Sequence, residues 1–365
     1  MMKKTIIIFV LLIVLSCSSD ESDTSNPSQS IYYPPIGSTE WETTSPEDLN
    51  WNATKIPELL SLLENGKTRA FIILIDGKIV MENYWGKDLL NLTDFDQEKN
   101  WYWASAAKTL TAFTIGKAEE EGFLSVADKT SNYLGSGWTS MTSEQENKIT
   151  IFHQLSMTSG LDDSFLGLNI DILAPENLKY KADPGERWSY HNPPYTLLAP
   201  TLEAATGEDF NTYFNTKLSD KIGMNGNWIW SNYKHLYFST ARSMARFGHL
   251  ILNSGKWENE QLLNEIYIQQ MTSTSQAINK GYGYLWWLND KKTYMLPGLQ
   301  IVFPENATPS APIDMYSGIG KDGQYVCVIP SKKMVLVRMG ENPDNALVPV
   351  KFLEDIWGKL NEIMP

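Results

Sequence analysis

Hydrophobic positions follow one pattern near the two ends of the chain and another pattern in its middle. Residues 69–75 and 78–85 are strand-like apolar runs, and Asp76-Gly77 between them favours a tight hairpin turn. Further strand-like runs lie close to the C-terminus, at 315–318, 324–329 and 334–339. The pattern therefore predicts antiparallel strands from both ends of the chain.

Between these runs the apolar residues recur at intervals of three or four, which is typical of helices. The predicted helical segments are 104–122, 149–158, 195–206, 209–222 and 240–254, with two more at 56–63 and 347–363. Strands at both ends with helices between them predict an α+β fold, in which one antiparallel sheet is flanked by helices. We expect the sheet subdomain at about 50–115 and 265–365, and an inserted helical domain at about 116–264.

The N-terminus has the pattern of a secretory signal. Two lysines precede an apolar run at 5–15 that is too short to span a bilayer, so residues 1–16 are predicted to be a signal peptide. Cys17 closes a segment that resembles a bacterial lipobox, which predicts its lipidation; an ordinary signal with a chance cysteine is the alternative. Residues 17–40 are rich in Ser, Asp and Pro, as in a flexible tether. We thus expect a folded domain at 41–365, lipid-anchored in the bacterial cell envelope, on the periplasmic or cell-surface face of the outer membrane.

Charge and cysteine content exclude several classes of function. The formal net charge is −13 and no basic cluster interrupts it, so nucleic acid is not an expected partner. Cys327 is the only cysteine besides Cys17, so no disulfide framework is possible, and its apolar surroundings predict a core residue. The four histidines are scattered and no metal-binding motif is present, so we expect neither a metal nor a cofactor.

Ser105 and Lys108 form the most informative pair in the chain. At a spacing of three on a helix, the lysine amine can reach the serine hydroxyl. A lysine that is buried enough to be neutral can take the proton of that serine and make it a nucleophile. The spacing is common, and Ser231 and Lys234 repeat it in a polar stretch predicted to be a loop. An ordinary helix start with a solvated lysine is therefore the competing interpretation.

Two other segments contain groups that such a pair needs. Tyr190, in Tyr190-His-Asn192, follows a turn-forming stretch and precedes two prolines, so a rigid loop can point it into a cleft to transfer a proton. The same spelling at 213–215 lies within a helical pattern and is predicted to be a packed aromatic. Three glycines in 318–324 allow the backbone to approach a substrate closely, or form a plain turn into a strand.

Taken together, these motifs resemble those of serine hydrolases related to class C β-lactamases and penicillin-binding proteins, including esterases and aminohexanoate-dimer hydrolases. The resemblance extends from about residue 60 to 360 and includes segments 103–108, 122–128, 149–161, 183–192, 197–207, 245–253 and 281–287. It implies a β-lactamase/transpeptidase-like fold with the active site between the sheet and the helical insert. It also implies that Ser105 is the nucleophile, Lys108 its base and Tyr190 the proton shuttle.

The same resemblance implies a substrate and oxyanion site. Asn192 would hydrogen-bond Lys108 or the substrate, and the backbone N–H of Ser105 would form half of the oxyanion hole. The other half would come from the third motif, where we place Lys321, and the binding residues there would be Gly320, Lys321, Gly323 and Gln324. This motif departs from the Lys-Thr-Gly of β-lactamases and is closer to the Gly-x-x-Gly-Gln form of esterases. Because Asp322 partly cancels the charge of Lys321, efficient β-lactamase activity is not expected.

The sequence thus predicts a serine hydrolase that cleaves a small ester, amide or peptide through an acyl-enzyme on Ser105. A D-amino-acid peptidase or carboxypeptidase, or a β-lactamase of the cell envelope, is the alternative within this class. A non-catalytic binding lipoprotein on the same fold is a further alternative, against which the intact Ser105, Lys108 and Tyr190 argue. His191 either tunes the neighbouring tyrosine or simply hydrogen-bonds the loop.

Overall fold

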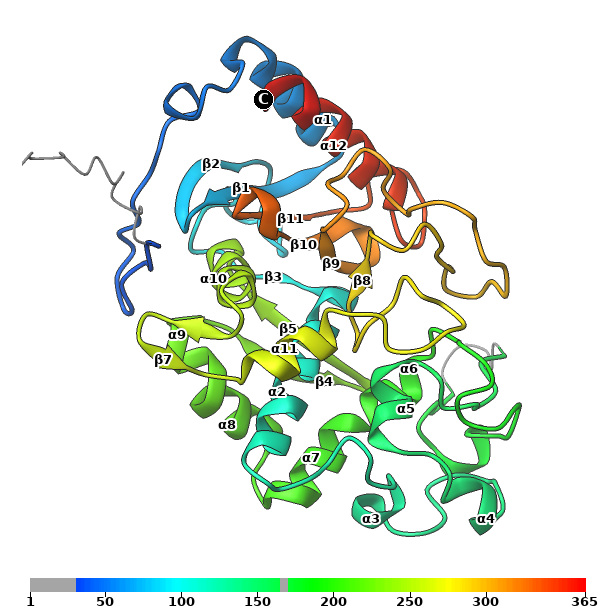
Figure 1. Cartoon of the computed structure of the whole chain (residues 1–365). Coiled ribbons are helices and arrows are strands. Elements are labelled where there is room, and N and C mark those ends of the chain that lie inside the picture. The colour runs from blue at the N-terminus through cyan, green and yellow to red at the C-terminus, as the bar shows by residue number, and fades with distance from the viewer. Residues whose placement is uncertain (1–30, 165–169) are drawn as a thin grey trace, which may run out of the picture. The chain divides into compact units, whose positions relative to one another are not determined.

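The two ends of the chain meet in one antiparallel sheet of six strands (Figure 1). This computed structural model describes residues 31–164 and 170–365. The strands of the sheet are β1 (Thr68–Ile75), β2 (Lys78–Tyr84), β8 (Trp287–Leu288), β9 (Tyr316–Gly320), β10 (Gln324–Ile329) and β11 (Met334–Gly340). They lie in the order β2-β1-β11-β10-β9-β8, so N-terminal β1 pairs with C-terminal β11, with Ile72 opposite Val337. The predicted α+β fold, with one sheet from both chain ends, is confirmed.

The first hairpin forms where the turn residues require it. Asp76 and Gly77 connect β1 to β2 with φ angles of 49° and 85°. Two positive φ angles in succession are the signature of the turn type that Asp-Gly favours. A side chain at Gly77 would also begin 2.0 Å from the carbonyl oxygen of Tyr32, so only glycine fits there.

Helices cover both faces of the sheet. On one face, α10 (Ala241–Leu252) packs against β1, β10 and β11, and Gly248 permits the close approach, because a Cβ there would lie 2.5 Å from a methyl group of Val335. On the opposite side lie α1 (Ile56–Asn65) and α12 (Val350–Ile363), which pack against each other (Figure 1). The predicted boundary at 264 assigned α10 to the helical insert, whereas its apolar face packs on the sheet.

The rest of the middle region surrounds α2 (Lys108–Glu120), which is buried along most of its length. Its other helices are α3 (Ser131–Leu134), α4 (Ser143–Glu146), α5 (Ile151–Leu155), α6 (Asn192–Thr196), α7 (Leu198–Thr206), α8 (Phe210–Phe214) and α9 (Asp220–Ile222), followed after α10 by α11 (Glu265–Met271). This region is not purely helical. A three-stranded sheet joins β3 (Trp101–Tyr102), β5 (Lys234–Ser239) and β4 (Asn227–Ser231), and a small ribbon joins β6 (Lys256–Trp257) to β7 (Glu260–Gln261). Ser231 and Lys234 flank the β4–β5 turn.

The compact part of the structure begins at Tyr32, within the segment predicted to be a tether. Arg246 donates hydrogen bonds to the carbonyl oxygens of Pro34 (3.0 Å) and Pro35 (2.8 Å), and Arg242 donates to that of Thr39 (2.5 Å). These two arginines of α10 therefore hold residues 32–40 against the domain. The predicted signal peptide, the predicted lipidation site Cys17 and the first part of the predicted tether lie outside the described residues. No helix among those described is both long and apolar enough to cross a membrane.

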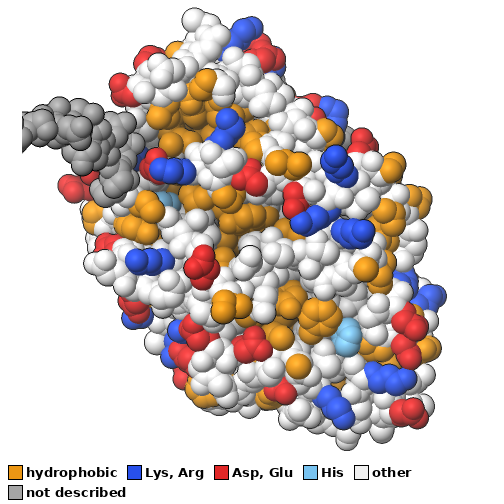
Figure 2. All heavy atoms as spheres, viewed as in Figure 1, with side chains coloured by type: hydrophobic (Ala, Val, Ile, Leu, Met, Phe, Trp, Pro, Cys, Tyr) orange, Lys and Arg blue, Asp and Glu red, His pale blue; other side chains and the backbone are white. Residues whose placement is uncertain are grey.

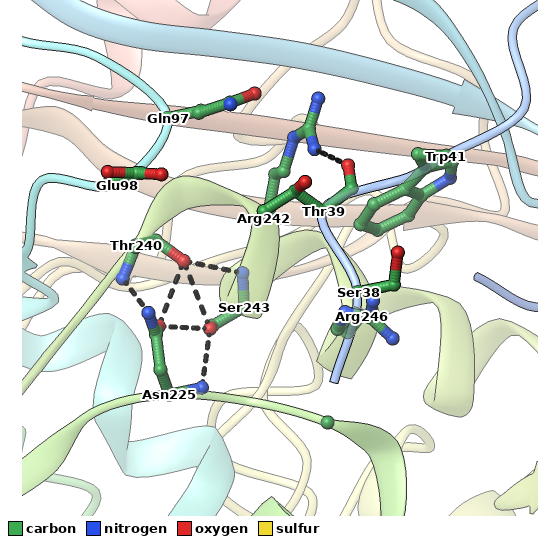
Figure 3. Close-up of a pocket in the computed structure, with 11 residues that line it drawn as sticks. Ser38, Thr39, Trp41, Gln97, Glu98, Asn225, Thr240, Arg242, Ser243 and Arg246 are labelled. Atoms are coloured by element: carbon green, nitrogen blue, oxygen red, sulfur yellow. Dashed lines mark hydrogen bonds between the residues drawn. The ribbon is translucent and has the colours of Figure 1, made fainter. Parts of the chain in front are cut away.

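A pocket of about 350 Å³ lies between this N-terminal segment and α10 (Figure 3). Its polar side chains from Asn225 and from residues 240–246 have protein partners. The Asn225 side-chain oxygen accepts from the hydroxyls of Thr240 (2.9 Å) and Ser243 (2.6 Å), as Figure 3 shows. Arg242 is paired with Glu82 at 2.6 Å. We therefore interpret the pocket as part of the packing that holds residues 32–40 against α10.

Candidate active site

Ser105 lies on a strained turn between β3 and α2. The preceding Ala104 has a φ of +47°, a left-handed conformation that alanine rarely adopts. Trp103 anchors the turn to β5. Its backbone N–H donates to the carbonyl of Tyr237 (2.9 Å), and its buried indole N–H donates to the Ser239 hydroxyl (2.7 Å). A 3₁₀ turn, η3 (Ala104–Ala107), then leads into α2. The predicted helix at 104–122 thus begins as a 3₁₀ turn, which fixes the orientation of Ser105.

The amine of Lys108 lies within hydrogen-bonding distance of the serine hydroxyl. Its Nζ is 3.1 Å from the Ser105 Oγ, and the residue is 3 % exposed. Burial lowers the pKa of Lys108 to about 7. The rings of Tyr195 and Tyr190 flank the amine, with centroids 4.2 and 5.1 Å from Nζ. A substantial share of the amine is therefore neutral near pH 7 and can accept the proton of Ser105.

Tyr190 reaches the same hydroxyl from the segment that precedes α6. Burial raises the pKa of Tyr190 above its usual range, and a hydrogen bond with Ser105 opposes this shift only in part. The phenol is therefore protonated at neutral pH and can act as a proton donor. Its ring stacks on Trp287 at a centroid distance of 5.7 Å and meets Tyr282 edge-on at 6.2 Å. The structure thus brings Ser105, Lys108 and Tyr190 together.

Strand β9 borders the serine turn on its other side. A Cβ at Gly320 would lie 2.6 Å from the carbonyl oxygen of Trp103 and 3.0 Å from the amide nitrogen of Ala106. A Cβ at Gly318 would lie 3.0 Å from a methyl group of Thr109. The two glycines therefore allow β9 to approach η3 closely, as the glycine-rich pattern predicted.

The alternation along β9 identifies a backbone group at its free edge. The carbonyl of Met315 accepts from the amide of Asn289 (3.0 Å), and Ser317 pairs with Trp287 of β8. Every second residue of a strand directs its N–H and C=O to the same side, so those of Ile319 face this side too. β8 pairs only as far as Ser317, which leaves the Ile319 N–H at an open edge beside the Ser105 turn. The predicted site did not include Ile319, because the side to which its N–H points depends on which strand pairs with β9.

The other third-motif residues lie elsewhere. Lys321 is in the turn after β9, with its side chain 62 % exposed and its Nζ 3.8 Å from the carboxylate of Asp322. Gln324 is fully buried, and its side-chain amide donates to the Gly340 carbonyl (2.6 Å) and accepts from the Gly340 N–H (3.0 Å). The carbonyl of Gly323 accepts from Arg338 (2.8 Å). Gly323 and Gln324 therefore tie β10 to β11 instead of lining the serine, which differs from the predicted substrate-binding role.

The two residues after Tyr190 also differ from the simplest expectation. Asn192 is the exposed first residue of α6, and among the described residues the hydrogen-bond partner of Lys108 is Ser105, not Asn192. For His191, burial lowers the pKa to about 4, and the nearby Asp163 opposes this shift only in part. His191 is thus neutral at physiological pH and does not place a positive charge beside Tyr190.

An arm with an apolar tip is tied to the segment that contains Tyr190. Residues 294–303 form a hairpin-like arm, in which Tyr294 and Phe303 exchange backbone hydrogen bonds of 3.3 and 2.9 Å. Gln300, near its tip, donates to the carbonyl of Trp188 (3.1 Å) and ties the arm to the Tyr190 segment. Exposed apolar side chains of the tip are Leu299, Ile301 and Val302. Figure 2 shows hydrophobic side chains gathered along the middle of one hollowed face of the molecule.

No three His, Cys, Asp or Glu side chains cluster closely enough to hold a metal ion in the two described stretches of the chain. The fully buried Cys327 lies in β10, and burial raises the pKa of its thiol to about 12. This agrees with the prediction of a core cysteine.

Comparison with known proteins places this geometry in a family. Residues 66–346 match the Beta-lactamase family, and the chain belongs to that family. An uncharacterized protein of Alkalihalophilus pseudofirmus is 24 % identical over 298 residues, which are 73 % of this chain and 81 % of the relative.

Two solved structures support the fold at low sequence identity. A putative 6-aminohexanoate-dimer hydrolase from Bacillus anthracis is 20 % identical, with a TM-score of 0.66 over 92 % of this chain and 91 % of the other. EstCE1, described as a hydrolase with promiscuous acyltransferase activity, is 14 % identical, with a TM-score of 0.66 over 86 % and 99 % of the two chains. The β-lactamase/transpeptidase-like fold expected from the sequence is thereby confirmed.

Proposed function

We propose that this protein is a serine hydrolase that works through an acyl-enzyme on Ser105. The observation that carries the proposal is the 3.1 Å contact between the Ser105 hydroxyl and a buried lysine whose pKa is lowered to about 7. As the Ser105 Oγ attacks the substrate carbonyl carbon, Lys108 takes the hydroxyl proton and a C–O bond forms. The negative charge on the carbonyl oxygen is held by the backbone N–H groups of Ser105 and Ile319.

Tyr190 completes the first half of the reaction. It gives its proton to the leaving oxygen or nitrogen as the scissile bond breaks, and it regains a proton from Lys108. Water then attacks the acyl carbon, and the bond from that carbon to the Ser105 oxygen breaks as the same pair transfers one proton from the water to that oxygen. The acid is released and the site returns to its starting state. Each step uses groups that lie around one hydroxyl, which supports a hydrolase over a non-catalytic binding protein.

The charges around the site favour an uncharged substrate. The expected cation, Lys321, is mostly exposed and has Asp322 beside it, so it offers little attraction to a substrate carboxylate. The arm beside Tyr190 presents apolar side chains at its tip. An ester or amide with an uncharged, apolar acyl group therefore suits this site better than an anionic β-lactam or the C-terminal carboxylate of a peptide.

Covalent labelling tests the proposed nucleophile. A fluorophosphonate probe should label the wild-type protein with loss of fluoride, and mass spectrometry should locate the adduct on the peptide that contains Ser105. A folded wild-type protein that takes up no probe would favour the binding-protein alternative. An adduct on a different serine would refute this site while leaving a hydrolase possible.

Substrate preference tests the interpretation of the third motif. We expect p-nitrophenyl esters of uncharged acids to be hydrolysed with a kcat/KM at least about 100-fold above that for a chromogenic cephalosporin, because Lys321 is mostly exposed and has Asp322 beside it, so it attracts the cephalosporin carboxylate only weakly. Parallel initial-rate assays on one preparation measure this ratio. Cephalosporin turnover equal to ester turnover would instead assign a β-lactamase.

We also propose that Cys17 carries a lipid that anchors the domain in the cell envelope. The pattern of residues 1–17 supports this proposal. Metabolic labelling with a fatty-acid analogue, lost in Cys17→Ser, tests it.

A further inference from the structure

The carboxylate of Asp163 binds two side chains of the segment just before Tyr190, the proposed proton shuttle. One oxygen of Asp163 accepts from the Arg187 guanidinium at 2.7 Å, and its other oxygen accepts a hydrogen bond from the Ser189 hydroxyl. The two side chains flank Trp188, whose side chain is fully buried. One carboxylate therefore binds the residue before Trp188 and the residue after it. Tyr190 follows directly in the chain.

We propose that Asp163 is a positioning residue for Tyr190, which fixes the phenol at the distance from Ser105 that proton transfer requires. The inference rests on the proposed function, because it assigns Asp163 a role only through Tyr190. Asp163 itself touches neither Ser105 nor Lys108 through any hydrogen bond of the described residues.

Other hydrogen bonds also hold the segment before Tyr190, and the Asp163 carboxylate adds to them. The amide of Ser189 donates to the carbonyl of Met157 (2.9 Å), and the amide of Gly185 donates to that of Thr158 (2.8 Å). These bonds, together with the hydrogen bond from Gln300 to the Trp188 carbonyl, hold the main chain of the segment. The Asp163 carboxylate adds two side-chain contacts, one from each neighbour of Trp188, and charge-assisted hydrogen bonds are stronger than neutral ones.

The carboxylate is ionised in the folded protein. Burial alone would raise the pKa of Asp163, but the Ser189 hydroxyl and the Arg187 guanidinium together lower it below its ordinary value. Both partners of this ion pair are less than one-fifth exposed, with side-chain exposures of 18 % for Asp163 and 19 % for Arg187. Water therefore screens the pair less than a surface salt bridge.

A leaving-group comparison separates positioning from a general structural role. The kcat/KM of an ester reports acylation, and a p-nitrophenolate leaves without being protonated, whereas an alkoxide needs the proton of Tyr190. We therefore compare a p-nitrophenyl ester with an alkyl ester of the same acid. Loss of Tyr190 function should slow the alkyl ester much more than the p-nitrophenyl ester.

The variants are Asp163→Ala, Asp163→Asn and Tyr190→Phe, with Asp162→Asn as the matched control. Asp162 directly precedes Asp163 in the chain, but its ionic partner is Lys181 at 3.6 Å and not a residue of the Tyr190 segment. We expect Asp163→Ala to lose at least about 10-fold more kcat/KM on the alkyl ester than on the p-nitrophenyl ester. Asp163→Asn, which keeps an acceptor for Ser189 and loses the charge facing Arg187, should lie between Asp163→Ala and wild type, and Asp162→Asn should match wild type.

Each outcome distinguishes this inference from the proposed function. If Tyr190→Phe shows the leaving-group effect and Asp163→Asn and Asp163→Ala do not, Asp163 is not a positioning residue, although the proposed mechanism stands. If Tyr190→Phe itself shows no such effect, the shuttle role of Tyr190 is wrong. Equal losses on both esters in Asp163→Asn, with an unchanged thermal unfolding midpoint, would also overturn the inference.

Discussion

Replacing Ser105 by alanine should lower kcat/KM for ester hydrolysis by about 10³-fold or more, because the attacking oxygen is removed and no other group takes its place. Its side chain is small and lies in a turn held by Trp103, so the fold should tolerate the change. Steady-state rates on a p-nitrophenyl ester measure the loss, and thermal unfolding checks that the variant is folded.

The chain contains its own matched control for this variant. Ser231 precedes Lys234 at the same spacing as in the proposed active pair, but the two residues flank the exposed β4–β5 turn. Ser231→Ala should therefore keep wild-type activity and wild-type probe labelling. If Ser105→Ala were to retain more than about a tenth of the activity, the acyl-enzyme mechanism proposed for Ser105 would be refuted.

Much of the fold could be predicted because β1, β10 and β11 are largely apolar runs and the β1–β2 hairpin has a specific turn dipeptide. The small β3-β5-β4 sheet was not predicted, since its strands are short and β4 is largely exposed, so no continuous apolar run marks it. The role of α10 was also missed: a helical period shows that one face is buried but not which element covers it.

The site could be predicted only as far as local chemistry determines it. Ser105 and Lys108 are neighbours on one turn, so their contact follows from spacing alone. Tyr190 lies far away in sequence: its loop context made it a candidate, and the family resemblance implied its role. The roles of Gln324 and Ile319 depend on strand pairing, because Gln324 faces Gly340 of β11 and Ile319 faces the free edge of β9. Composition does not determine such pairing.

Replacing Lys108 by methionine should abolish activity and at the same time stabilise the fold. The lysine is 3 % exposed and burial lowers its pKa to about 7, whereas in the unfolded chain its pKa is about 10.4. Burial of this amine therefore costs stability at neutral pH. Methionine has a similar length and no charge to desolvate, so the free energy of unfolding should rise by roughly 2–4 kcal/mol at pH 7, with a loss in kcat/KM of about 10³-fold or more.

The stability gained in Lys108→Met should depend on pH. Between about pH 7 and 10.4 the unfolded lysine binds a proton that the folded lysine has lost, so the contribution of Lys108 to the free energy of unfolding rises with pH in this window. Below pH 7 both states are protonated and the contribution is constant. The advantage of Lys108→Met should therefore be largest near pH 6 and shrink towards pH 10. Urea unfolding of both proteins at pH 6, 8 and 9.5 measures the difference.

Activity should follow the same titration, because only the neutral amine can accept the Ser105 proton. Wild-type kcat/KM should rise with pH and level off above about pH 7. Lys117→Met on the same helix is the control: Lys117 is paired with Glu120 at 2.6 Å, so its loss should leave activity intact and bring no stabilisation. A rate profile that rises only near pH 10, together with a Lys108→Met variant no more stable than wild type, would mean that Lys108 is charged in the folded protein. A charged Lys108 could orient the serine but not deprotonate it, and the base would have to be sought in Tyr190.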